Sequence, residues 1–199
     1  MVGIIDYGVG NLFSLRSSFA AIGVEAFVSG DAGELAKADR LILPGVGAFG
    51  DAAEKLRATG LDAFVREQAA AGKPLMGICL GMQLLFERSF EYGEHFGLGL
   101  LKGQVVGMSG RLPEGLKIPH MGWNALKLTK AAKLLEEGSY VYFVHSFYAE
   151  NCEDSLAAVT DYGIPITAAV EKGNIFGCQF HPENSGNVGL AILKKFCEV

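Results

Sequence analysis

Short apolar segments alternate with amphipathic helical segments through the first 90 residues of this 199-residue chain. The apolar segments predict strands at Val2–Asp6, Val24–Ser29, Arg40–Leu43 and Lys73–Met76. The intervening segments predict helices at Leu12–Ile22, from Asp31, and from about Asp51 to Ala71 with a possible break near Gly60. This alternation predicts a mostly parallel sheet with helices on both faces and right-handed crossovers.

The second half of the chain is rich in strand-like segments. They lie at Gln104–Met108, Asn124–Leu128, Tyr140–Phe147, Leu156–Thr160, Ile166–Val170 and Ile175–Phe180, and a helix is predicted at Gly186–Cys197. These segments are expected to extend the sheet with antiparallel or mixed strands. Because no linker or low-complexity segment separates the halves, residues 1–199 are predicted to form one α/β domain.

Composition excludes several classes of function. A formal net charge of −5 without a basic cluster argues against nucleic-acid binding. No apolar stretch approaches the roughly 18–20 residues of a membrane span, and the N-terminus lacks the pattern of a secretory signal. Four cysteines without a disulfide or zinc spacing fit reduced thiols in the cytoplasm, and no metal site or cofactor is predicted.

The stretch Gly77–Gln83 predicts a reactive cysteine. Cys79 lies between a short strand and a predicted helix at Leu80–Ser89, and Gly77 and Gly81 permit a tight turn there. The first helical amides would then favour the thiolate form of Cys79. Gln83 lies one helical turn further on the same face. From this stretch alone, a structural cysteine in a glycine-rich turn is an equally good interpretation.

Two more motifs fall at predicted carboxyl ends of strands. The loop Pro44–Gly50 contains three glycines and can offer backbone N–H groups to an oxyanion, although a plain turn fits it equally well. His181 and Glu183 follow the last strand on either side of Pro182. Cys79, His181 and Glu183 together have the composition of a nucleophile, base and acid triad. Alone, His181 would more readily be a surface turn residue, but the coincidence of three motifs at one sheet edge favours catalysis.

These motifs resemble those of class I glutamine amidotransferases. Three further stretches narrow the resemblance to the glutaminase subunits of imidazole glycerol phosphate synthases: Ile5–Leu12, Pro119–Asn124 and Tyr142–Ser146. The order and spacing cover essentially the whole chain. The resemblance implies a flavodoxin-like α/β fold and no cofactor.

It further implies hydrolysis of L-glutamine to glutamate and ammonia through a Cys79 thioester. The ammonia would pass to a (β/α)₈-barrel cyclase subunit, in a heterodimer, which makes imidazole glycerol phosphate and an aminoimidazole carboxamide ribotide. Backbone N–H groups of Leu80, Val46 and Gly47 would bind the oxyanion. A reorientation of the loop Gly45–Gly47 is a hypothesis for an off state before the partner binds.

The resemblance also assigns binding residues. Those for the substrate are Gln83, Glu91, Ser146 and Phe147, and those for the cyclase are His120, Met121, Trp123, Asn124 and Asn184. From sequence alone, Glu91 could equally be a solvated charge, and the Gly-Trp pair could lie in a core strand. His145 is predicted to line the pocket.

Two residues depart from the family pattern. Asn184 replaces a common Lys that pairs with the barrel, and Phe147 replaces a common Tyr. Because Asn184 lacks the charge of that Lys, it is uncertain from the sequence how strongly the chain communicates with its partner.

Other functions stay open at this point. The chain could be the glutaminase subunit of another synthase, such as a para-aminobenzoate or sugar-modifying enzyme. A flavodoxin-like cysteine hydrolase would share the elbow, but Gln83 and the Pro44–Gly47 loop argue against it. A degenerate, non-enzymatic subunit would lack a triad residue, and all three are present.

Overall fold

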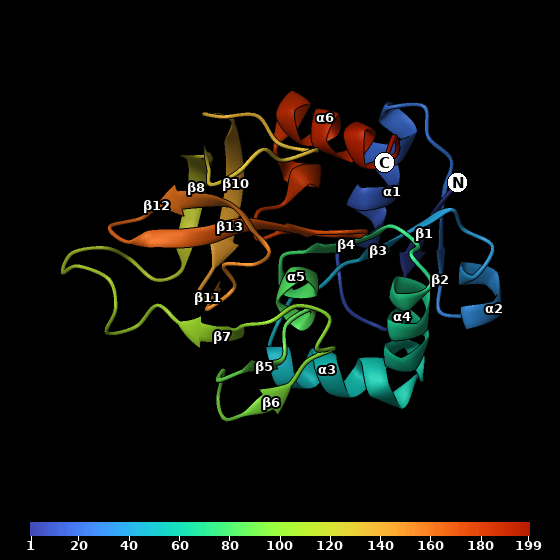
Figure 1. Ribbon diagram of the computed structural model, residues 1–199, viewed down its shortest axis with the longest axis horizontal. Coiled ribbons are helices and arrows are strands. Elements are labelled where there is room, and N and C mark those ends of the chain that lie inside the picture. Colours follow the sequence, from blue (N-terminus) through green and yellow to red (C-terminus); the bar gives the residue numbers. More distant parts are fainter.

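The computed structural model describes residues 1–199 and is built around an eight-stranded mixed sheet (Figure 1). Its strand order is β2-β1-β3-β4-β14-β13-β12-β9, and neighbours from β2 to β14 are parallel. The remaining pairs are antiparallel. The strands are β1 Val2–Ile5, β2 Ala26–Ser29, β3 Arg40–Leu43, β4 Leu75–Ile78, β9 Lys127–Leu128, β12 Leu156–Asp161, β13 Pro165–Lys172 and β14 Ile175–Cys178.

Helices cover both faces of this sheet, as the alternating pattern predicts (Figure 1). The helices are α1 Leu12–Ala21, α2 Ala32–Leu35, α3 Phe49–Ala58, α4 Leu61–Ala70, α5 Leu80–Leu84 and α6 Gly186–Phe196, with a 3₁₀ turn η1 at Pro182–Asn184. Side chains of α3, α4 and α5 pack into one apolar core, and those of α1 and α6 pack into another. Successive residues of β1 pack into opposite cores, since Ile4 belongs to the second core and Ile5 to the first. The predicted break at Gly60 is confirmed, because this residue has φ 72° between α3 and α4.

Two smaller sheets lie beside the large one. β8 (His120–Ala125) pairs antiparallel with β10 (Tyr140–His145). The other sheet has the order β11-β7-β5-β6 and consists of β5 Arg88–Ser89, β6 His95–Phe96, β7 Gln104–Gly107 and β11 Phe147–Glu150. The second half is therefore mixed and antiparallel, as predicted, but only part of it extends the large sheet.

The predicted helix Leu80–Ser89 is wrong in its length. α5 ends at Leu84, and Arg88–Ser89 forms strand β5. The reason is tertiary: the carbonyls of Leu84 and Leu85 accept hydrogen bonds from the N–H groups of Leu98, Leu100 and Leu101. These bonds satisfy groups that would otherwise continue the helix. No helix of the structure has the length and apolar character needed to cross a membrane.

Candidate active site

Cys79 lies on a strained turn between β4 and α5. Its backbone has φ 55° and ψ −113°, a conformation that non-glycine residues rarely adopt. The Cys79 N–H donates to the Cys178 carbonyl at 2.8 Å, which ties the turn to β14. A Cβ at Gly81 would lie 1.9 Å from the Leu43 carbonyl oxygen, and one at Gly77 would lie 2.6 Å from the Gly81 oxygen. Only glycine fits at both positions, so the sequence motif has a direct steric cause.

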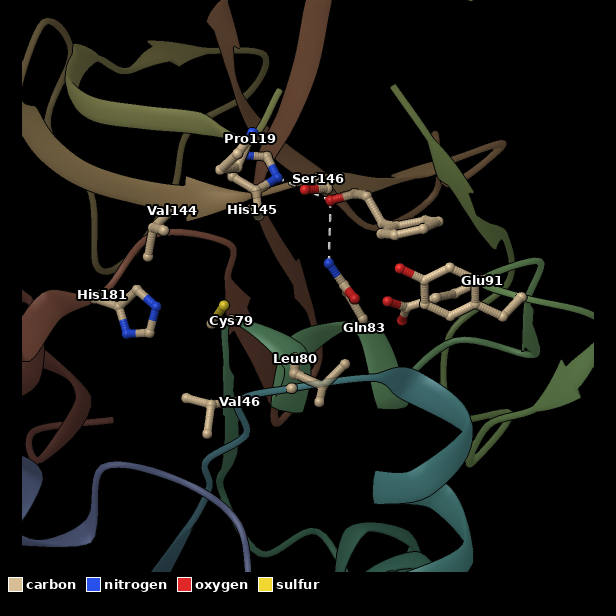
Figure 2. Close-up of a pocket in the computed structure, with 13 residues that line it drawn as sticks. Val46, Cys79, Leu80, Gln83, Glu91, Pro119, Val144, His145, Ser146 and His181 are labelled. Carbon is tan, nitrogen blue, oxygen red and sulfur yellow. Dashed lines mark hydrogen bonds between the residues drawn. The ribbon is translucent and has the colours of Figure 1, made fainter. Parts of the chain in front are cut away.

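A pocket of about 400 Å³ opens at the carboxyl ends of the parallel strands, above Cys79. Figure 2 shows the side chains of Cys79 and His181 facing it, with Gln83 and Glu91 farther along. All the residues predicted for the oxyanion and the substrate line this pocket: Val46, Gly47, Leu80, Gln83, Glu91, Ser146 and Phe147. Sequence segments more than 100 residues apart thus meet at one site, where ligands bind in open parallel sheets.

His181 and Glu183 form a buried pair beside Cys79. His181 Nδ1 lies 2.8 Å from Glu183 Oε1, and the Glu183 side chain is only 2% exposed. Burial lowers the pKa of His181, but its interactions with Cys79 and Glu183 outweigh burial and raise that pKa to about 10. The pair therefore favours the imidazolium form of His181. Such an imidazolium can deliver a proton to a leaving group.

The loop after β3 lines the same pocket and contains two free amides. The N–H groups of Val46 and Gly47 donate no hydrogen bond within the chain. The loop is held at its start, because the Tyr7 hydroxyl donates to the Pro44 carbonyl at 2.7 Å. Burial and the neighbouring Cys79 both raise the pKa of Tyr7, which keeps this hydroxyl a donor. Free amides near a nucleophile can bind an oxyanion.

Gln83 and Glu91 form the far end of the pocket. Gln83 Nε2 donates to the Phe147 carbonyl at 3.1 Å and to Gln179 Oε1 at 2.9 Å, which uses both of its hydrogens. Glu91 Oε2 accepts from the Phe49 N–H at 2.7 Å, at the start of α3. Burial raises the pKa of Glu91, while the Phe49 N–H opposes that shift. Both side chains keep oxygen acceptors for a ligand, which suits an ammonium group.

The predicted partner-binding residues divide into exposed and buried ones. Met121 and Trp123 are 61% and 55% exposed, on the same side of β8, so Trp123 does not lie in a core strand. Asn184 is also exposed, and the Trp123 ring lies near Gly186. Asn124 is half-buried, and its side chain donates to the Asp161 carbonyl.

His120 requires a correction. It is 2% exposed, and its ring stacks on Phe143 and on Tyr162. Its side chain points into the protein because residues of a strand alternate between the two faces, and Met121 takes the outer one. His120 is therefore not a surface contact.

Sequence reasoning missed four residues of the site. Tyr92, Pro119 and Val144 line the pocket, and Gln179 Nε2 lies 3.8 Å from Cys79 Sγ. Gln179 had a detectable signal: it is a polar residue in an otherwise apolar strand, two positions before His181. Tyr92 had none, because it lies in the β5–β6 connection, outside every motif that the sequence offered. No group of three or more His, Cys, Asp or Glu side chains is arranged to hold a metal ion.

Comparison with known proteins agrees with this geometry. The family model for class-I glutamine amidotransferases matches residues 3–199. The chain therefore belongs to the class-I glutamine amidotransferase family, and the resemblance predicted from its motifs is confirmed.

Curated relatives place it more closely within that family. The chain is 51% identical over 204 residues to the imidazole glycerol phosphate synthase subunit HisH of Wolinella succinogenes, with all of both chains covered. It is 52% identical to that of Caldanaerobacter subterraneus, covering 100% of this chain and 98% of the relative. The Bacillus subtilis subunit is 49% identical, with 100% and 96% covered.

Solved structures at lower identity share the fold. A glutamine amidotransferase crystal structure is 21% identical with a TM-score of 0.78, covering 99% of this chain and 97% of that one. The structure of PurLQS from Thermotoga maritima is 22% identical with a TM-score of 0.77 and the same coverage. These likenesses confirm the predicted flavodoxin-like α/β fold class.

Proposed function

We propose that this chain is the glutaminase subunit of an imidazole glycerol phosphate synthase of histidine biosynthesis. The observation that carries the proposal is the pocket in which Cys79 and His181 face a set of acceptors suited to a glutamine α-ammonium. Full-length identity of about 50% to curated HisH subunits supports this synthase over a para-aminobenzoate or sugar-modifying one.

In the first step, the Cys79 thiolate attacks the side-chain amide carbon of glutamine. The resulting oxyanion accepts hydrogen bonds from the backbone N–H groups of Leu80 and of the Val46–Gly47 loop. His181 gives its proton to the amide nitrogen, the carbon–nitrogen bond breaks, and ammonia leaves a thioester on Cys79. Glu183 holds the imidazolium through Nδ1.

In the second step, neutral His181 takes a proton from water, which attacks the thioester carbon. The carbon–sulfur bond breaks, and the thiolate and imidazolium are restored. The new carboxyl group releases its proton to water, and glutamate leaves. Throughout, Gln83 and Glu91 hold the α-ammonium of the substrate. The backbone at Ser146 and Phe147 would contact the same end of the ligand.

The ammonia would be consumed by a (β/α)₈-barrel cyclase bound as the other half of a heterodimer. The outer face of the β8–β10 sheet supports this partner site, because it carries exposed Met121 and Trp123. Met121 pairs across the sheet with Val144, which lines the pocket. The proposed docking face therefore adjoins the place where ammonia forms. The two large apolar side chains lie on one side of β8, as expected of an interaction site.

The cyclase would also control turnover. Gly47 has φ 92° in a loop whose amides are unpaired, so peptide reorientation there meets little resistance. We infer that partner binding sets this loop. A cytoplasmic location is consistent with the four free cysteines and with thiolate chemistry.

The test is glutamine hydrolysis by the purified chain, alone and with a histidine-pathway cyclase subunit plus its nucleotide ligand. We expect turnover to rise steeply in the complex, and Cys79→Ala to abolish it. Equal turnover with and without the cyclase would refute the partner assignment and the loop hypothesis. Absence of hydrolysis under both conditions would refute the glutaminase assignment.

A further inference from the structure

We propose that Gln179 is a further catalytic residue, whose side-chain amide donates a hydrogen bond to the sulfur of Cys79 and stabilises its thiolate form. Gln179 Nε2 lies 3.8 Å from Cys79 Sγ, within the range of an N–H···S bond. The inference rests on the proposed function, since it assigns a role in the same thiolate chemistry.

The orientation of the Gln179 amide follows from its neighbours. The Phe147 carbonyl can only accept hydrogen bonds, so the group of Gln83 that contacts it at 3.1 Å must be the nitrogen. The second hydrogen of that nitrogen points to the oxygen of Gln179, 2.9 Å away. The nitrogen of Gln179 is therefore the atom that faces Cys79. No other assignment satisfies every donor and acceptor along this path.

The Phe147 carbonyl also accepts a hydrogen bond from His145. His145 Nδ1 lies 2.8 Å from the Phe147 oxygen, so Nδ1 carries the proton and Nε2 accepts. His120 Nδ1 lies 3.1 Å from His145 Nε2 and must then be the donor. Burial lowers the pKa of His120 to about 4 and is also the main cause that lowers the pKa of His145, to about 3. Both rings are therefore neutral near pH 7, as this arrangement requires.

Burial strengthens the effect on the sulfur. Gln179 is 0% exposed, so water does not compete for its amide. Its backbone is also fixed, because its N–H donates to the Ala168 carbonyl at 2.8 Å. A donor fixed in this way stabilises an anion without reorganisation. It would favour the resting thiolate and also its departure from the thioester in the second step.

A purely structural role is the competing interpretation, in which Gln179 only holds Gln83. Two variants separate the roles. Gln179→Met removes both the donor to sulfur and the acceptor for Gln83. Gln179→Glu keeps an acceptor for Gln83 but faces the sulfur with a carboxylate oxygen. Thr160→Val is the matched control, since it removes one hydrogen bond of a fully buried side chain, to the Ala125 carbonyl, away from the pocket.

The measurement is the pH dependence of Cys79 alkylation by iodoacetamide in the full-length chain, read by mass spectrometry of the Cys79 peptide. The other ionisable groups whose charges act on Cys79 are Tyr7, Cys178 and His181, and none of them is changed. We expect the alkylation midpoint to rise by about one pH unit in Gln179→Met and by more in Gln179→Glu, with no change in Thr160→Val. Glutaminase kcat near pH 7 should fall about tenfold in Gln179→Met and recover partly at higher pH.

A Gln179→Glu midpoint equal to that of the unaltered chain would overturn the proposal and leave the structural role. If Gln179→Met does not fold, the alkylation midpoint of the isosteric Gln179→Glu variant is sufficient to decide between the two roles. Because alkylation requires neither glutamine nor the cyclase, this result is separate from the test of the proposed function. An unaltered chain that lacks glutaminase activity would refute that function while the midpoints still report on Gln179.

Discussion

The carboxyl edge of the large sheet and the two-stranded β8–β10 sheet both border the pocket, but they differ in how far their side chains are buried. At the sheet edge, Cys79, His181 and the side chain of Glu183 are buried and held by short contacts within the chain. On β8, the inner residue His120 is buried, whereas Met121 and Trp123 expose their side chains. The contacts of the first region all come from this chain, whereas the second region exposes apolar side chains.

We expect this difference to separate the chemistry of the site from its control by a partner. Residues of the sheet edge should determine whether glutamine is hydrolysed at all. Residues of the β8–β10 face should determine how strongly a partner binds and how far it stimulates turnover. Substitutions in the two regions should therefore affect different measurements, and the following predictions test that division.

The largest effect is expected for His181→Asn. Without the imidazolium, the leaving ammonia receives no proton, and water loses its base. We predict a fall in kcat of at least about 10⁴-fold, for the isolated chain and for the complex alike. The measurement is steady-state glutamate production. Stimulation by the partner that rescued this variant would contradict the division between the two regions.

Glu183→Gln should reduce kcat by about 10²-fold, because the imidazolium loses the carboxylate that helps to raise its pKa. The alkaline limb of the pH–rate profile should move to lower pH, since His181 then releases its proton more easily.

Stability gives a second measurement of Glu183→Gln. A raised pKa in the folded state contributes stability that is present in full below pH 6.5 and is lost as the pH rises towards about 10. The difference in unfolding free energy between the unaltered chain and Glu183→Gln should therefore be largest below pH 6.5 and should narrow above it. Urea unfolding at several pH values measures this. If the difference in unfolding free energy instead grew with pH, the His181–Glu183 ion pair would not exist in solution.

Trp123→Ala should weaken binding to the cyclase by about 30-fold, the effect of losing a large aromatic side chain at an interface. Because Trp123 is more than half exposed, the stability of the isolated chain should change by less than about 0.5 kcal/mol. Titration calorimetry and thermal unfolding provide the two readouts. Phe13→Ala is a suitable control, since Phe13 is an exposed aromatic on α1 outside this sheet.

The smallest effect is expected for Asn184→Lys. A rim charge adds at most about 1 kcal/mol to binding, so affinity and stimulation should rise no more than about fivefold. Turnover by the isolated chain should stay unchanged, because Asn184 is exposed. Measuring stimulated turnover at low and high salt tests whether any gain is electrostatic.

Much of the site could be predicted because its motifs depend on local geometry. The need for glycine at Gly77 arises within the turn, although that at Gly81 also involves Leu43 of β3, and the coupling of His181 to Glu183 spans only two residues. By contrast, the length of α5 depends on hydrogen bonds from Leu98–Leu101, and the burial of His120 depends on packing between Phe143 and Tyr162. A local pattern holds no information about such distant neighbours.

The sequence by itself determined the class of fold and the family, and it predicted Cys79, His181 and Glu183 as nucleophile, base and acid, because strand–helix periodicity and short motifs lie in consecutive residues. Only the tertiary structure decided that Gln179 faces the sulfur and that His145 and Gln83 share the Phe147 carbonyl. It also decided that Met121 points outward while His120 points inward. These relations arise where separate elements meet, because buried polar groups find their partners, and the faces of a strand their packing, only in three dimensions.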